Sequence, residues 1–110
     1  MSTEPTPARL FARAVALAAA LDPRATILAR TRCGLCYVSA AVSHDAIMPR
    51  LAGGQDSDPE VALRRLVESL ERATAGRVSE LRRDAADETD PSEADLLERE
   101  ACALERLVAA

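Results

Sequence analysis

The chain has 110 residues, of which 48% are hydrophobic and 2% aromatic, and its formal net charge is −4 at pH 7. This length fits one domain with one modest core, and the longest apolar run, residues 14–21, is far too short to cross a bilayer. All 14 basic residues are arginines, which excludes lysine Schiff-base chemistry and phosphate-binding P-loops.

The charge is uneven along the chain. Residues 1–50 carry six arginines against three acids, and residues 51–110 carry eight arginines against fifteen acids. The arginines are scattered and few aromatic side chains could stack on bases, so we expect no nucleic-acid partner. The N-terminus has an acid where a signal peptide carries basic residues, which favours a cytoplasmic protein without a membrane partner. There, the three cysteines are expected to be reduced thiols, metal ligands or redox groups.

Four dipeptides mark helix starts, because each places an N-cap acceptor before a proline suited to the first helical position. They are Thr6-Pro7, Asp22-Pro23, Asp58-Pro59 and Asp90-Pro91. They predict helices over residues 7–21, 23–48, 59–87 and 91–108. The sequence therefore predicts an all-α fold, a single-domain four-helix bundle over residues 7–110, after a disordered tail over residues 1–6.

The spacing of apolar residues supports these helices. The third segment has apolar residues at steps of three and four, and the fourth has two adjacent apolar rows. The second is apolar nearly all round, which favours a central position in the bundle, although Thr26-Ile27-Leu28 is also compatible with a short strand. We expect a loop at Gly53-Gly54 and a bend at Gly76.

The main candidate for chemistry is the motif Cys33-Gly34-Leu35-Cys36. On a helix these two cysteines share one face, with Cα atoms about 5 Å apart. They could then form a disulfide or bind a soft metal such as zinc, and Arg30 and Arg32, one turn earlier, would favour the thiolates. Cys33 and Cys36 are therefore candidate catalytic and metal-binding residues.

The competing interpretation is that these cysteines belong to the core, where free cysteine is common. The same helical face would continue through Ala40, His44, Ile47 and Leu51. His44 would lie about 12 Å beyond Cys36 along a helix that rises 1.5 Å per residue. A metal on Cys33 and Cys36 would thus need ligands from another helix or subunit.

Three families share short features with this region. Thr26-Ile27-Leu28 leading into Cys-Gly-Leu-Cys and a predicted helix resembles the thioredoxin active-site turn, but the further strands of that fold are not predicted. The helical setting resembles alkylhydroperoxidase D-like proteins, but their histidine falls at Ala40 and their glutamate at Leu21. The cysteine motif is also similar to the first one of nickel–iron hydrogenase large subunits, but the second, C-terminal CxxC is missing. No family is assigned.

The fourth predicted helix carries the candidate interface. Its apolar arc is wider than contact with one neighbouring helix requires. Cys102 falls among charged residues, where either a partner shields the thiol or the cysteine has no particular role. We expect a small helical interaction or assembly module, either a homo-oligomer or a small subunit of a larger complex, with Leu96, Cys102 and Leu107 at the contact. The alternative is a thiol protein using Cys33 and Cys36: a redox sensor, a peroxidase-like oxidoreductase or a metal-binding regulator. Only that alternative calls for a metal.

Overall fold

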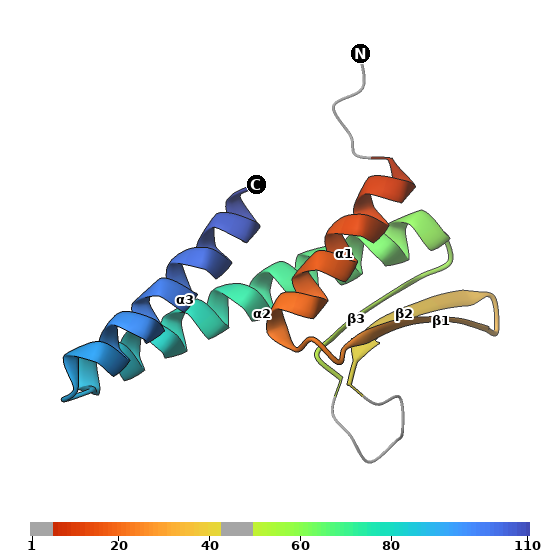
Figure 1. Cartoon of the computed structure of the whole chain (residues 1–110). Coiled ribbons are helices and arrows are strands. Elements are labelled where there is room, and N and C mark those ends of the chain that lie inside the picture. Colours follow the sequence, from red (N-terminus) through yellow and green to blue (C-terminus); the bar gives the residue numbers. More distant parts are fainter. Residues whose placement is uncertain (1–5, 43–49) are drawn as a thin grey trace. The chain divides into compact units, whose positions relative to one another are not determined.

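The computed structural model describes residues 6–42 and 50–110 and shows a mixed α/β fold. Its elements, in chain order, are α1 (Pro7–Leu21), β1 (Thr26–Arg32), β2 (Leu35–Ala41), β3 (Ala52–Asp56), α2 (Pro59–Asp87) and α3 (Pro91–Ala109) (Figure 1). The chain divides into two compact units, Met1–Leu70 and Glu71–Ala110, with the boundary inside α2.

Three of the four predicted start marks do begin helices. The Arg9 backbone N–H donates to Thr6 Oγ1 over 3.3 Å at the start of α1. Asp58 accepts a 2.9 Å hydrogen bond from the Glu60 N–H at the start of α2, and Asp90 accepts one of the same length from the Ser92 N–H at the start of α3. These side chains satisfy N–H groups that the first helical turn leaves without a partner.

The all-α four-helix bundle, however, is wrong, because the segment 23–48 does not form a helix. Residues 26–32 and 35–41 form the antiparallel strands β1 and β2, joined by the two-residue turn Cys33-Gly34. These two residues have φ angles of 53° and 77°. Positive φ at both central positions is the signature of a type I′ hairpin turn, and it is incompatible with a right-handed helix.

The misassignment has a physical origin in how β2 is buried. Four consecutive residues of β2, Val38–Ala41, are buried, so the strand lacks the alternation of apolar and polar residues that marks a half-exposed strand. A short apolar run of this kind looks the same in a buried helix. The Cys-Gly pair was the turn signal that could have separated the two interpretations.

The sheet has the order β1-β2-β3, with both pairs antiparallel. The loop predicted at Gly53-Gly54 is also wrong, since both glycines lie in β3. A β-carbon on Gly54 would lie 2.6 Å from the Leu66 backbone nitrogen and closer still to the Ala62 carbonyl oxygen. Glycine therefore lets the backbone of β3 lie directly against α2.

The core of the first unit surrounds this contact. Its fully or nearly fully buried aliphatic residues come from α1, from β2 and β3, and from the first turns of α2: Leu10, Ala14, Leu17, Ala18, Val38, Ala40, Ala41, Ala52, Ala62, Leu66, Val67 and Leu70. Many are alanines, so the packed elements approach closely instead of being separated by large side chains.

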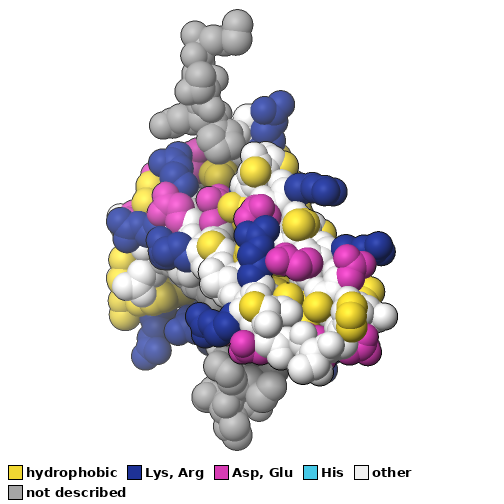
Figure 2. Space-filling view, turned by 90° about the vertical axis from the view of Figure 1, so that its left-hand side faces the viewer, with side chains coloured by type: hydrophobic (Ala, Val, Ile, Leu, Met, Phe, Trp, Pro, Cys, Tyr) yellow, Lys and Arg dark blue, Asp and Glu magenta, His cyan; other side chains and the backbone are white. Residues whose placement is uncertain are grey.

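The second unit is a helical hairpin formed by the rest of α2 and by α3. Val78 and Leu81 of α2 pack with Ala101 and Leu104 of α3, and Leu97 borders this cluster. One of the two apolar rows predicted for the fourth helix is thus the row that faces α2. Figure 2 shows acidic and basic side chains interspersed over the face that it displays. Within the described residues, no helix is both long and apolar enough to cross a membrane.

Two glycine-to-alanine changes, one at the close contact between β3 and α2 and one at an uncrowded helical position, test this packing. Gly54→Ala should lower the free energy of unfolding by about 1–3 kcal/mol, because the new methyl group meets backbone atoms of α2 that cannot move aside. Gly76→Ala should raise it by about 0.5–1 kcal/mol, because this helical position has nothing within 4 Å of the new methyl group. Urea denaturation of both variants measures the difference. Equal effects of the two changes would contradict the close contact at Gly54.

Candidate functional site

The two cysteines of the CxxC motif lie in different local structures. Cys33 is the exposed first residue of the hairpin turn, and Cys36 is a half-buried residue of β2. In the sheet register, Cys36 lies between Thr31 of β1 and Asp56 of β3. Both thiols are free.

The chemistry inferred from a helical CxxC therefore loses its geometric basis. The two thiols do not follow each other by one helical turn, and the arginines 30 and 32 lie in β1 instead of one turn before each thiol. The segment after the motif is a strand and not a helix, which also removes the resemblance to the thioredoxin turn. In residues 6–42 and 50–110 no group of three or more His, Cys, Asp or Glu side chains is arranged to hold a metal ion.

The competing interpretation, in which the two cysteines belong to a buried helical face, also loses its basis. It assumed a continuous helix, but Ala40 is a buried residue of β2 and Leu51 is a half-buried residue just before β3. His44 and Ile47 lie outside the described residues, as do the predicted end of the second helix at residue 48 and most of the predicted N-terminal tail.

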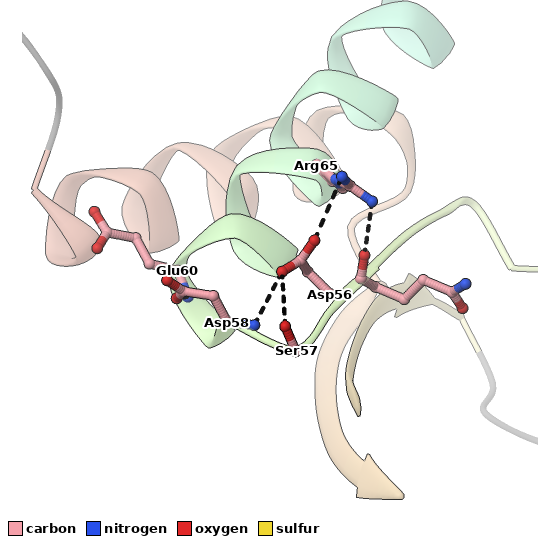
Figure 3. A network of polar contacts seen from close by, with 6 residues as sticks. Asp56, Ser57, Asp58, Glu60 and Arg65 are labelled. Carbon is pink, nitrogen blue, oxygen red and sulfur yellow. Dashed lines mark hydrogen bonds and ion pairs between the residues drawn. The ribbon is translucent and has the colours of Figure 1, made fainter. Parts of the chain in front are cut away.

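An acidic cluster lies at the junction of β3 and α2 (Figure 3). Asp56 accepts a 3.0 Å hydrogen bond from the Asp58 N–H and pairs with the Arg65 guanidinium over 3.4 Å. Arg65 also donates to the Gln55 carbonyl oxygen over 3.1 Å. These contacts close the turn that leads from the last strand into the helix, so we assign the cluster a structural role.

Cys102 lies beside the ion pair that joins the two helices of the second unit. Arg82 of α2 donates two hydrogen bonds, of 2.6 and 3.1 Å, to the Glu105 carboxylate of α3, and it also interacts with the Cys102 side chain. The thiol is half-buried, so a neighbouring helix of the same chain accounts for part of its shielding. The hydrogen bonds from Arg82 hold the pKa of Glu105 below its usual range.

The least expected surface is the outer face of α1. The exposed large hydrophobic side chains are Phe11 (51% exposed) and Val15 (45%) of α1 and Leu96 (58%) of α3 among the residues that the structure describes. Phe11 and Val15 are four residues apart and lie on one face of the helix. The spacing of apolar residues in this segment could have revealed the surface, because they cover more of the helix than one packing face needs.

Leu96 is the member of the predicted interface that the structure leaves most exposed. Leu107 is half-buried, like Cys102. Leu96 and Leu107 belong to the second apolar row of α3, which lies beside the row that packs against α2. Leu96, at the start of this second row, is exposed, whereas Leu107 is half-buried.

Comparison of the chain with protein-family models, with curated proteins and with solved structures found no match.

The turn at Cys33 provides a test of whether the thiol matters. Cys33→Asn should raise the free energy of unfolding by about 0.5 kcal/mol, because Asn tolerates positive φ better than other non-glycine residues and Asn-Gly is a preferred type I′ pair. Thermal melts of the two proteins measure this. If the variant is more stable and keeps all association behaviour, the thiol serves neither folding nor assembly; loss of a peroxide response in the same variant would favour the thiol alternative.

The Arg82–Glu105 pair should give the second unit a pH-dependent contribution to stability. Because the folded-state pKa of Glu105 is lowered, this contribution is present at neutral pH and is lost as the pH falls through that pKa. Glu105→Gln should therefore lower the melting temperature slightly at pH 7 and have no effect in strong acid. An equal loss at both pH values would mean that the substitution acts through packing instead of charge.

Proposed function

We propose that this protein is a small interaction and assembly module, which binds a helix of another protein on the outer face of α1. The observation that carries this proposal is the exposure of Phe11 and Val15 on a helix whose opposite face is already packed in the core.

The two faces of α1 support a partner on this helix. Leu10, Ala14, Leu17 and Ala18 are buried within the first unit. The exposed face would ordinarily be polar, but apart from Arg9 its residues within the helix are a proline, five alanines, Phe11 and Val15: Pro7, Ala8, Phe11, Ala12, Val15, Ala16, Ala19 and Ala20. Contiguous exposed apolar surface is typical of interaction sites, so this stripe supports the proposal.

The charge of α1 indicates the chemistry of the partner. Arg9 and Arg13 are the charged residues of this helix, and it has no acidic residue. A partner helix that carries an apolar stripe flanked by Asp or Glu would cover the alanines and Phe11 and place its acids near the arginines. The small alanine side chains allow two helix axes to approach closely.

The second exposed surface belongs to α3. Leu96 is 58% exposed, and together with Leu107 it forms the contact proposed from the sequence, with Cys102 at its border. This surface lies among several acidic residues of α3, so its charge differs in sign from that of α1. We propose it as a secondary contact within a larger assembly.

A cytoplasmic location is part of this proposal, and it is supported by the three free thiols, since reduced cysteines persist in that compartment. The thiol-protein alternative gains no support from the positions of Cys33 and Cys36, and it remains a prediction for a peroxide assay of the Cys33→Asn variant.

A designed peptide probe tests the α1 surface directly. The probe is a helical peptide with a Leu/Ala stripe flanked by Glu, and its control has Arg in place of every Glu. The acidic peptide should bind and the basic one should not, as measured by fluorescence anisotropy. Phe11→Glu should weaken binding at least tenfold, because it places a charge in the apolar contact, whereas Leu96→Glu should leave it unchanged. Equal binding of both peptides, or an equal effect of both variants, would contradict the proposal.

A further inference from the structure

The outer strand β1 suggests a second mode of association, at a surface separate from α1. We infer that the free edge of β1 pairs with β1 of a second copy of this chain, antiparallel and with Ala29 on the two-fold axis, which joins two three-stranded sheets into one. This inference names a partner for the assembly function, but it rests on β1 alone and can fail independently of the α1 surface.

The edge of β1 has backbone groups available for pairing. Within the described residues, β1 pairs with β2 on one side and with no strand on the other. The turn-closing pair Arg32–Leu35 carries the turn hydrogen bond, and hydrogen-bonded pairs alternate along an antiparallel ladder. The backbone N–H and C=O groups of Ile27, Ala29 and Thr31 therefore point away from β2, toward the free edge.

The two edges of the sheet differ in how they are protected. β3 is five residues long, contains two glycines, and lies against α2 at Gly54. Its Gln55 carbonyl accepts a hydrogen bond from Arg65, so another strand would have to displace that side chain. β1 has seven residues in regular register with β2, and it contains no proline, glycine or acid. Charged side chains also protect an edge, and β1 carries Arg30 and Arg32, so pairing is favourable only in a register that keeps these arginines from facing each other.

The sequence of β1 is complementary to itself in one register. With Ala29 opposite the partner's Ala29, each Ile27 lies opposite the partner's Thr31, and each such pair exchanges two backbone hydrogen bonds. On the other face of the sheet, Arg30 lies opposite Leu28 of the partner copy and Arg32 opposite its Thr26. No arginine then faces another arginine directly, and the small Ala29 side chain lies at the crowded axis.

The neighbouring registers are worse. A shift of two residues toward the turn places Arg30 opposite the partner's Arg30, and like charges directly opposite are destabilising. A shift the other way leaves Arg32 without a strand residue opposite it. The register centred on Ala29 uses all seven residues of β1. Because one strand edge buries a small area, we expect a dimer that depends on protein concentration.

A charge substitution at an exposed position tests the register. Thr26→Glu places an acid opposite Arg32 of the partner copy at both ends of the interface, and it should tighten the dimer by about two- to thirtyfold. Thr26→Arg should weaken it by a similar factor, and adding Arg32→Glu to Thr26→Arg should restore it. Sedimentation equilibrium across a concentration series measures the shift from 11.7 kDa toward twice that mass. A wild-type chain that stays monomeric throughout, or two Thr26 variants that change association in the same direction, would overturn the inference.

Disulfide trapping provides a second readout that needs only transient pairing. In a chain with Cys33→Asn, Cys36→Ser and Cys102→Ser, the added change Ala29→Cys should give a covalent dimer on mild oxidation, because residues opposite in a ladder are within disulfide range. Ile27→Cys and Thr31→Cys should not do so alone, but a mixture of the two should. Gln55→Cys, on the opposite edge, is the control. Equal crosslinking by every single variant, or none by Ala29→Cys, would overturn the proposed register.

Phe11→Glu separates this inference from the proposed function. It should abolish binding of the acidic helical peptide while leaving the β1-dependent dimer intact. If instead Phe11→Glu removes self-association and the Thr26 variants do not change it, the second copy binds through α1 and the β1 inference is wrong.

Discussion

The first unit depends on the contact between β3 and α2 at Gly54. At this point the strand backbone and the helix backbone approach so closely that no side chain fits between them. The contact joins the sheet to the helix, and the alanines at positions 52 and 62 extend it with small buried side chains. Arg65 then secures the same junction from outside, through the Gln55 carbonyl and the Asp56 carboxylate. The β3 edge of the sheet is thereby held against α2, whereas no strand among the described residues pairs with the opposite edge, β1.

The distribution of small residues has a second consequence. A core made mainly of alanine and leucine buries limited area in a short chain, and α1 has more apolar surface than this core can cover. The excess lies on its outer face, with Phe11 as the largest exposed hydrophobic side chain of this helix. In the second unit a single packed row of α3 faces α2, which leaves Leu96 in solvent. Both surfaces support association more directly than they support chemistry.

The cysteines show how far a local motif can be interpreted. If residues 23–48 formed a helix, Cys33 and Cys36 would lie on one face of it, and an arginine would lie one turn before each cysteine. A type I′ turn instead places Cys33 at its tip and Cys36 within β2, so the spacing of the motif carries a different meaning in a hairpin. Of the predicted contact residues of α3, Leu96 is exposed, whereas Cys102 lies next to Arg82 of the same chain.

The sequence alone determined where three helices begin, because a capping side chain followed by proline acts within one turn of the chain. It could not determine which structure the chain adopts after Asp22-Pro23. There Asp22 accepts a 2.9 Å hydrogen bond from the N–H two residues later, as Asp58 and Asp90 do, yet the chain continues into β1. The local hydrogen bond is the same at all three positions, and it serves equally well as a turn or as a helix cap. The tertiary structure decided between them: β2 lies between two other strands with four consecutive residues buried, and Gly54 allows that sheet to lie against α2.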